Sequence, residues 1–259
     1  MSQDLATSGH PQNQLARNPE DDGSVMAAFE RLEEAELSRY CRSISVDGVI
    51  AQTVSIEFDQ GQTLWAARGS LLAYDEGIDW KLKVPGGVGK AASRMLSGEG
   101  ASLTHVTATR PGASAVIGSN QAGRLATWDL SRGPIVCAPG SFVAALGDVD
   151  IQVTTAKRAG AAFFGGAGLF LQRLSGNGIA VVHGSGDFVE RELAPGEKLL
   201  VSTGNLSVFS GGVDYNIRGV GGCFKSLFGG EGLFMTELTG PGWVMLQTMK
   251  QFQGGQNNS

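Results

Sequence analysis

One short pattern occurs three times in this chain and constrains its fold more than any other feature. Each copy begins with a glycine followed by Ser or Asn, and a constant spacing then leads to an aspartate. The pairs are Gly69 and Asp79, Gly140 and Asp150, and Gly204 and Asp214. Repeats of this kind are typical of one supersecondary unit copied and packed around a shared core. The sequence therefore predicts three degenerate repeats, at about residues 43–120, 121–187 and 188–250.

A glycine-rich run recurs in step with this pattern. Residues 165–170 (GGAGLF) return as residues 229–234 (GGEGLF), and residues 98–103 are a degraded version of the same run. Glycine accounts for 39 of the 259 residues, which is about twice its usual share of roughly 7%. Glycine reaches positive φ without steric cost, so many tight turns and bent strand ends are expected.

Apolar stretches between these glycines predict strands. They are short, regularly spaced and bounded by Gly, Pro or Asp, which is typical of an all-β sandwich or barrel-like fold. The predicted strands are residues 49–58, 64–74, 78–84, 103–109, 135–146, 149–155, 169–174, 179–183, 199–209, 213–220, 233–239 and 243–248. Three such units in one chain favour pseudo-threefold symmetry. The glycine inside each long strand is expected to mark a bulge or a bend.

The two ends of the chain differ in composition from the β region. Residues 1–23 are polar and acidic and are expected to be disordered. Residues 24–42 place Met26, Phe29 and Leu32 at helical spacing opposite glutamates, which predicts one amphipathic helix that packs on the domain or on a neighbouring subunit. Residues 43–250 are then a single all-β domain, and residues 251–259 a flexible tail.

Composition limits the classes of partner. The net charge is −5 and the pI is about 5.3, which argues against a nucleic-acid-binding surface. The cysteines Cys41, Cys137 and Cys223 are far apart and form no zinc or disulfide pattern, which favours a reducing compartment. No apolar run reaches the length of a membrane span, and the N-terminus has no signal-peptide pattern, so a cytoplasmic location is expected.

Several motifs along the β region identify a family resemblance. They are residues 165–178, 193–197, 227–233 and 238–248. In this order they resemble the family of altered inheritance of mitochondria protein 24, in its uncharacterised bacterial branch, over about residues 43–251. Two features depart from the family pattern: the glycine run of the first repeat is degraded, and the N-terminal leader and helix are additions.

The resemblance implies a β-sandwich akin to that of the tryptophan RNA-binding attenuator, usually assembled into oligomers. For the fungal mitochondrial relatives it implies a role in inner-membrane organisation, which does not carry over to a chain without an import signal. It brings no catalytic residues and no cofactor.

Residues typical of enzymes do not form a catalytic pattern in this sequence. Residues 86–93 (GGVGKAAS) look like a phosphate-binding loop, but Val84 stands where that motif needs glycine and Ala91 where it needs Ser or Thr. Of the histidines His10, His105 and His183, no two have metal-ligand spacing. No serine lies in a Gly-x-Ser-x-Gly turn. We therefore expect no enzyme activity and no cofactor, with an unrecognised active site as the less favoured alternative.

Asp79, Asp150 and Asp214 are the weak candidates for metal ligands. Threefold recurrence in a symmetric fold could gather three carboxylates, which would repel one another unless a cation lay among them. The simpler interpretation, which we favour, is that each aspartate caps a turn or accepts backbone N–H bonds at a strand start.

An interaction surface is predicted where aromatic and aliphatic residues precede the glycine-rich loops. Its residues are Phe163, Phe164, Gly165, Gly166, Gly168, Phe224, Leu227, Phe228, Gly229, Gly230 and Gly232. The leading hypothesis is a non-enzymatic scaffold or partner-binding protein that self-associates, most simply as a homotrimer. It would bind an unknown protein or a membrane edge, with a link to membrane organisation or stress. The alternative is a protein that binds a small ligand, an anion or a divalent cation through its glycine-rich loops.

Overall fold

The computed structural model describes residues 39–85, 102–155, 170–219 and 234–250. Across these ranges the chain forms β-strands joined by turns, with two short 3-10 turns, η2 (Leu130–Arg132) and η3 (Thr203–Asn205), and no α-helix. The strands form three antiparallel sheets. The prediction of an all-β fold is confirmed.

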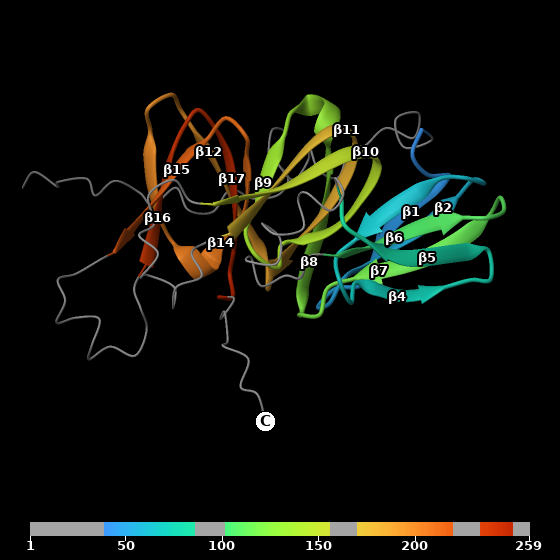
Figure 1. Ribbon diagram of the computed structural model, residues 1–259. Helices are drawn as coiled ribbons and strands as arrows, with labels where there is room; N and C mark the ends of the chain where they lie inside the picture. Colours follow the sequence, from blue (N-terminus) through green and yellow to red (C-terminus); the bar gives the residue numbers. More distant parts are fainter. Residues whose placement is uncertain (1–38, 86–101, 156–169, 220–233, 251–259) are drawn as a thin grey trace, which may run out of the picture.

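The strands fall into three groups along the chain, which we call the first, second and third units (Figure 1). The first unit holds β1 (Ser43–Asp47), β2 (Thr53–Phe58), β3 (Thr63–Ala66), β4 (Leu71–Tyr74), β5 (Ile78–Lys83), β6 (Leu103–Ala108) and β7 (Ala113–Gly118). The second holds β8 (Gly123–Asp129), β9 (Ile135–Cys137), β10 (Phe142–Thr155) and β11 (Phe170–Ser185). The third holds β12 (Phe188–Leu193), β13 (Lys198–Ser202), β14 (Leu206–Ser210), β15 (Asp214–Gly219), β16 (Phe234–Thr239) and β17 (Gly242–Gln247).

Strand pairing follows one pattern in each unit. The first unit has the orders β2-β7-β4 and β3-β6-β5, and the third has the orders β12-β17-β14 and β13-β16-β15. In the second unit β10 and β11 are long enough to belong to both layers. The start of β10 and the end of β11 pair with each other and with β8, whereas the end of β10 and the start of β11 pair with each other and with β9.

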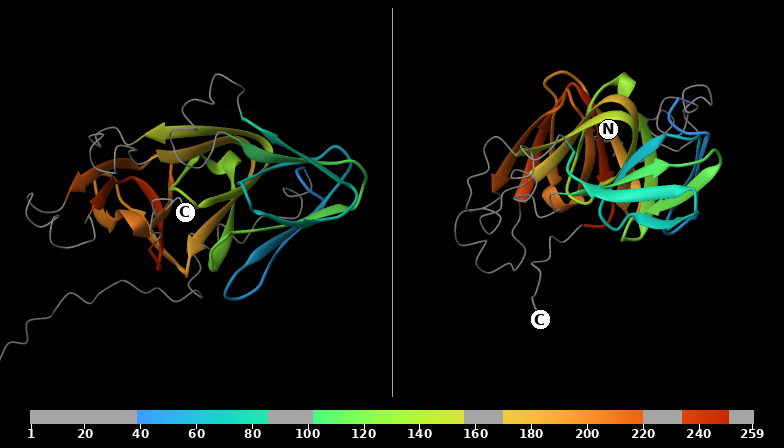
Figure 2. Two further views of the ribbon diagram at one scale, coloured as in Figure 1. Left: turned by 60° about the horizontal axis from the view of Figure 1, so that its bottom comes forward. Right: turned by 45° about the vertical axis from the view of Figure 1, so that its right-hand side comes forward.

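Two strand pairs join neighbouring units, and we call them the junctions. At the first junction, β3 of the first unit pairs with β10 of the second. At the second junction, β9 of the second unit pairs with β14 of the third. These junctions make one sheet of ten strands that runs through all three units, so that the units follow one another along the molecule (Figure 2).

The repeated glycine marks a turn that is followed by a bulge. Gly69 and Gly140 have φ angles of +79° and +75°, a left-handed conformation that favours glycine. The register of the next strand then shifts between Leu71 and Ala73 in β4, and equivalent shifts occur in β10 and β14. The predicted strands 64–74, 135–146 and 199–209 are therefore wrong in one respect: each is two strands separated by this turn.

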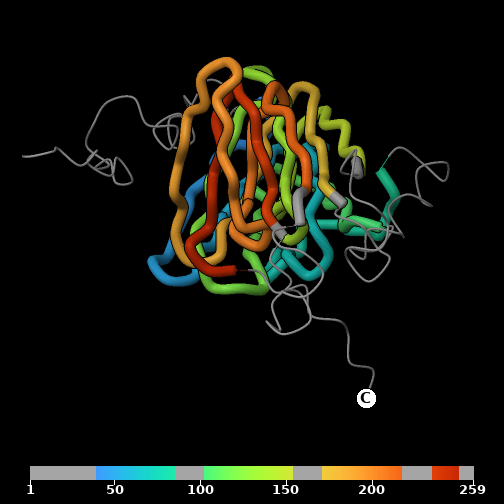
Figure 3. Tube along the Cα trace, turned by 90° about the vertical axis from the view of Figure 1, so that its left-hand side faces the viewer, coloured from blue at the N-terminus to red at the C-terminus, as the bar shows by residue number. Residues whose placement is uncertain are grey.

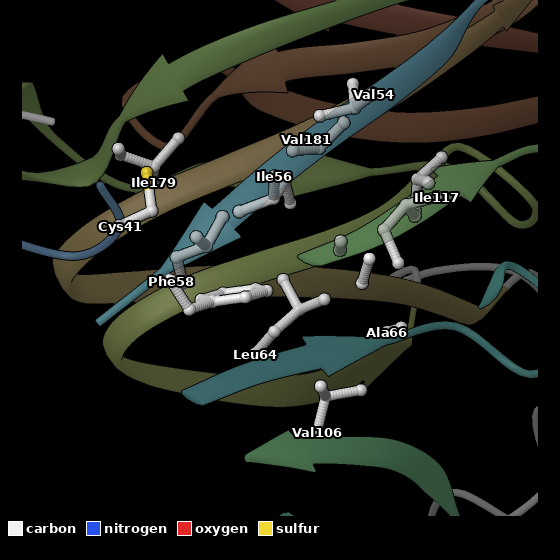
Figure 4. Close-up of a cluster of buried hydrophobic side chains, with 14 of the residues drawn as sticks. Cys41, Val54, Ile56, Phe58, Leu64, Ala66, Val106, Ile117, Ile179 and Val181 are labelled. Carbon is white, nitrogen blue, oxygen red and sulfur yellow. The ribbon is translucent and has the colours of Figure 1, made fainter. Parts of the chain in front are cut away.

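Apolar side chains form three buried clusters, one centred on each unit. The first lies between the sheet β1-β2-β7-β4 and the strands β3, β6 and β5, where Phe58, Leu64 and Ile117 are fully buried (Figure 4). β2 shows why: its residues alternate between buried and half-buried, which is the period of a strand with one face on the core. Residues of β10 and β11 complete this cluster, so the first two units share part of one core.

Most of the predicted N-terminal segment lies outside the described residues. This holds for the predicted disordered leader and for the predicted helix up to residue 38. Residues 39–40 form a turn, and residues 41–42 that follow are not helical, so the predicted helix does not extend to residue 42. Arg42 follows this turn and donates from Nη2 to Oδ1 of Asp59 over 2.7 Å. The predicted tail, residues 251–259, also lies outside the described ranges.

Candidate functional site

A surface pocket of about 260 Å³ lies where the first and second units meet. Its polar lining comes from Arg68, Ser70, Asn120, Gln121 and Gln172. Leu103, Phe142 and Val143 supply the apolar part. A cationic group beside several amides and a small apolar wall suits a small polar or anionic ligand.

Local turn chemistry places these residues. Arg68 and Ser70 flank Gly69, whose positive φ turns the chain from β3 into β4. A Cβ added at Gly69 would lie 3.2 Å from Nδ2 of Asn120, so the absence of a side chain lets the 119–121 segment approach this turn. Gly140, the corresponding glycine of the second unit, lines the same pocket.

Buried polar side chains form a cluster next to the pocket. Ser185 Oγ donates to Oε1 of Gln121 over 2.7 Å, which links the cluster to the pocket lining. The backbone N–H of Ser185 donates to Oε1 of Gln247 over 3.0 Å, and Gln247 Nε2 donates to the carbonyl oxygen of Gly204 over 2.8 Å. These bonds tie the end of β11 to the third unit, because Gln247 lies on β17.

His183 is the titratable member of this cluster and is only 1% exposed. Its backbone N–H donates to the carbonyl oxygen of Ser141 over 2.8 Å, and its carbonyl oxygen accepts from Ser207 Oγ over 2.8 Å. Neither ring nitrogen has a hydrogen-bond partner among the described residues. Burial lowers the pKa of His183, and a weaker interaction with the backbone of Gln121 opposes that shift. The ring is therefore held neutral.

His105 lies elsewhere, on β6 of the first unit. Its ring meets that of Trp65 edge to face, with centroids 4.5 Å apart and an interplanar angle of 77°. Lys83 Nζ lies 3.3 Å from His105 Nδ1. Partial burial lowers the pKa of His105, and the charge of Lys83 lowers it further. His105 and His183 therefore occupy separate environments.

The three repeated aspartates lie at matching places on separate strands. Asp79 pairs with Thr107, Asp150 with Ser175 and Asp214 with Thr239 in the strand registers. All three are exposed. Asp150 accepts a side-chain hydrogen bond from Gln152. Within the described ranges no three His, Cys, Asp or Glu side chains gather into a group that could hold a metal ion, so the aspartates are not brought together.

Asp75, for which the sequence analysis predicted no role, holds the turn between β4 and β5. Its carboxylate accepts from the backbone N–H of Gly77 over 2.7 Å and from that of Ser114 over 2.8 Å. The bond from Gly77 is the main reason why the pKa of Asp75 is lowered, and the Ser114 bonds and Arg110 contribute. A capping role of the kind expected for Asp79 is thus filled by Asp75.

The remaining sequence candidates divide between buried residues and residues outside the described ranges. Cys41 and Cys137 are buried, and burial raises the pKa of Cys41 to about 11, so it is an unreactive thiol at neutral pH. Cys223, His10 and the loop 86–93 lie outside the described residues. The same is true of every predicted interaction-surface residue, which are Phe163, Phe164, Gly165, Gly166, Gly168, Phe224, Leu227, Phe228, Gly229, Gly230 and Gly232.

Four edge strands of the described sheets, β1, β4, β5 and β13, carry exposed apolar side chains. β4 is the last strand of the sheet β1-β2-β7-β4, and β13 is the first of the sheet β13-β16-β15. Leu72 and Tyr74 on β4 and Leu200 on β13 are each at least half exposed. Exposed edges of this kind are templates for pairing with another chain.

The pocket and the edges were not predicted, for a physical reason. Arg68, Asn120 and Gln121 come together only because the first and second units meet there. The one available signal was the repeated glycine, since its neighbours Arg68 and Ser70 both line the pocket. The open edges of β4 and β13 could not be recognised in the sequence, because Leu72, Tyr74 and Leu200 are residue types equally common in paired strands.

In the part of the chain that the structure describes, no helix has the length and apolarity needed to cross a bilayer.

Comparison with known proteins gives three findings. The family model described as Mitochondrial biogenesis AIM24 matches residues 44–249. An uncharacterized protein of Streptococcus pyogenes serotype M6 is 25% identical over 211 residues, which cover 78% of this chain and 84% of that protein. A crystal structure of a protein from Streptococcus pyogenes superposes with a TM-score of 0.67 at 21% identity, covering 80% of this chain and 94% of that one. At this identity the structural likeness shows a shared fold.

Proposed function

Because this chain belongs to the Mitochondrial biogenesis AIM24 family, with a shared fold but no reaction named for its relatives, we propose that it is a non-enzymatic scaffold that works through self-association. Partner proteins or a membrane edge would bind to the assembly. A link to membrane organisation or to stress is part of this proposal, and the inner-membrane role implied for the fungal relatives is not carried over to this chain.

One observation carries the proposal: the same strand pairing occurs in three successive units that are joined edge to edge. The orders β2-β7-β4 and β12-β17-β14 match, and the second unit repeats them with β8, β11 and β10. We propose that the units are three copies of one element, as the repeated glycine–aspartate pattern predicts. A fold built by adding copies at sheet edges is suited to adding further copies from other chains.

Sedimentation velocity at micromolar concentration tests the scaffold. We expect a species whose mass is a multiple of the 27.0 kDa chain, with the homotrimer as the favoured state. A protein that sediments as a 27.0 kDa monomer across this range would contradict the proposal. Capture of the native protein from its own cells would then identify partners of the assembly.

A second candidate function rests on the inter-unit pocket. Arg68 beside Gln121 and Gln172 supports binding of a small anionic ligand. Thermal-shift screening with nucleotides, inorganic phosphate and divalent ions tests it. A stabilising anion whose effect disappears in Arg68→Ala supports this function, whereas an unchanged melting temperature with every compound contradicts it.

A further inference from the structure

β4 and β13 are the two strands whose counterparts elsewhere in the chain form the junctions. β13 has the place in the third unit that β3 and β9 have in the first and second. β4 has the place in the first unit that β14 and the start of β10 have in the others. We propose that β13 of one copy of this chain pairs, antiparallel, with β4 of a second copy and so repeats the junction between molecules. The inference rests on the self-association proposed above and specifies its surface.

The known junctions fix the register of this pairing. Across them the central pairs are Trp65 with Ala145 and Val136 with Phe209. The registers within each unit show that Leu200 has the place of Trp65 and Val136, and that Tyr74 has the place of Ala145 and Phe209. Leu200 of one copy therefore lies opposite Tyr74 of the next.

The exposed fractions of Leu200 and Tyr74 indicate that these positions can accept a neighbouring strand. At the second junction Val136 is 3% exposed and Phe209 is fully buried. Their counterparts Leu200 and Tyr74 are 55% and 50% exposed. The same place in the fold is covered where a neighbouring unit is present and open where the chain supplies none.

Backbone hydrogen bonds extend the match. Just beyond the paired residues, Ala67 N–H donates to the carbonyl oxygen of Val143 and Ala138 N–H donates to that of Ser207, both over 2.7 Å. The equivalent bond between two copies runs from the N–H of Ser202 to the carbonyl oxygen of Leu72. The new junction thus offers the pattern already used twice within the chain.

At the other end of the proposed β13–β4 ladder, the two strands carry opposite charges. The second junction reaches Pro134 and Gly211, because Gly211 N–H donates to the carbonyl oxygen of Pro134 over 2.8 Å. The residues at these two places are Lys198 on β13 and Glu76 after β4, and both are exposed. Opposite charges directly across an antiparallel pair are stabilising. The register derived from the apolar pair therefore also pairs a lysine with a glutamate.

The two edges cannot meet within one molecule. The first unit, in blue to green, and the third, in orange to red, lie at opposite ends of the molecule (Figure 1), and the third unit lies in front of the other two when the molecule is seen end on (Figure 3). Pairing β13 with β4 is therefore head to tail between copies. Such a contact closes into a ring when its rotation permits, and a ring of three copies is the proposed homotrimer.

Charge reversal at the proposed contact tests it on the full chain. Glu76→Lys and Lys198→Glu each place like charges across the interface, and each variant is expected to self-associate roughly tenfold more weakly by sedimentation. Lys198→Glu also removes the ion pair that Lys198 Nζ forms with Glu237 Oε1 over 3.4 Å within the chain, so Glu76→Lys is the cleaner of the two variants. The double variant Glu76→Lys/Lys198→Glu restores opposite charges at every contact, also in a ring with an odd number of copies, and is expected to recover the wild-type mass distribution. Lys81→Glu is the matched control, because Lys81 is exposed on β5, whose counterpart at the end of β10 joins no neighbouring unit.

The outcomes separate this inference from the proposed function. A wild type that associates while both reversals leave its mass distribution unchanged overturns the β13–β4 contact but keeps the scaffold. Weakened single variants that the double variant does not rescue also overturn the contact, because their loss then has another cause. A monomeric wild type overturns both. To check for misfolding, each variant must retain the wild-type circular dichroism spectrum, because weaker association alone lowers the melting temperature.

Discussion

The indole rings of Trp128 and Trp243 lie with their centroids 4.7 Å apart and their planes tilted by 48°. Trp128 is on β8 of the second unit and Trp243 on β17 of the third, so this pair joins two units outside the strand ladder of the junction. Trp128 is further held by a hydrogen bond of 2.9 Å from Nε1 to the carbonyl oxygen of Gly133. The second and third units are therefore coupled by side-chain packing as well as by backbone bonds.

Trp243→Ala is expected to lower the free energy of unfolding by about 2 kcal/mol, below the usual range for a fully buried tryptophan because Trp243 is only partly buried. Urea unfolding at 25 °C measures the loss. Trp80→Ala is the comparison variant, since Trp80 is 45% exposed on β5 and donates from Nε1 to Tyr74 Oη over 3.0 Å, and it should cost about 1 kcal/mol. Equal losses in the two variants would contradict the packing role of Trp243.

Gln247→Met is expected to cost about 3 kcal/mol although it preserves side-chain size. The substitution leaves the buried N–H of Ser185 and the carbonyl oxygen of Gly204 without the partners that Gln247 gives them. Chemical denaturation measures the change. Gln152→Met provides a control on an exposed strand position and should change stability little. A Gln247→Met protein as stable as wild type would show that water replaces the lost bonds at no cost.

Two glycines separate steric from conformational effects. A Cβ at Gly178 would lie 2.0 Å from the carbonyl oxygen of Leu146, a contact that only a backbone shift can relieve. Gly196 has nothing within 4 Å of such a Cβ but has a φ of +79°. We expect Gly178→Ala to destabilise by about 3 kcal/mol and Gly196→Ala by about 1 kcal/mol, as measured by denaturant midpoints. The reverse order would show that the close cross-strand approach is not rigid.

The repeated glycine shows which part of this fold can be predicted from the sequence. Gly69 and Gly140 signalled a bend, and each lies in a turn with positive φ. Each bend separates two strands that were predicted as one. The prediction joined them because the turn is too short to interrupt the apolar pattern. The predicted strand ranges do not include β7 and β8, which contain several small residues that carry little hydrophobic signal.

Residues whose role depends on which strands are neighbours in the fold could not be predicted from the sequence. Leu200 and Tyr74 look like ordinary strand residues, and only the pairing order shows that their strands have an open side. Asp79 attracted attention through its recurrence, whereas Asp75 holds a turn, and its place in the third unit is taken by Ser210, which accepts the equivalent bond from the N–H of Trp243. The repeated sequence pattern therefore identified the strand arrangement that the units share, but not the positions at which the units differ.

The neutral state of His183 makes stability depend on pH. Histidine in an unfolded chain has a pKa of about 6.5, and burial lowers the pKa of His183 in the folded state. Below pH 6.5 the unfolded state therefore binds the extra proton first, so the free energy of unfolding falls as pH falls. The slope is up to ~1.4 kcal/mol per pH unit, and the fall stops once the folded pKa is passed. His105 contributes in the same direction, because its pKa is also lowered. Asp75 acts in a separate window: its pKa is lowered, so its contribution is lost only below about pH 4.

We expect the melting temperature of the wild type to drop between pH 7.5 and pH 5.5, and His183→Gln to remove most of that drop. Glutamine suits the site, because Gln247 has the corresponding place at the end of β17 and is also buried. His105→Gln should remove less, since His105 is only partly buried. Thermal scans at matched ionic strength measure all three proteins. A wild-type melting temperature that stays constant over this range would mean that the folded protein protonates His183 as readily as the unfolded chain does. The ring would then have to reach water or an acceptor on acidification, which its 1% exposure does not allow without a local opening of β11.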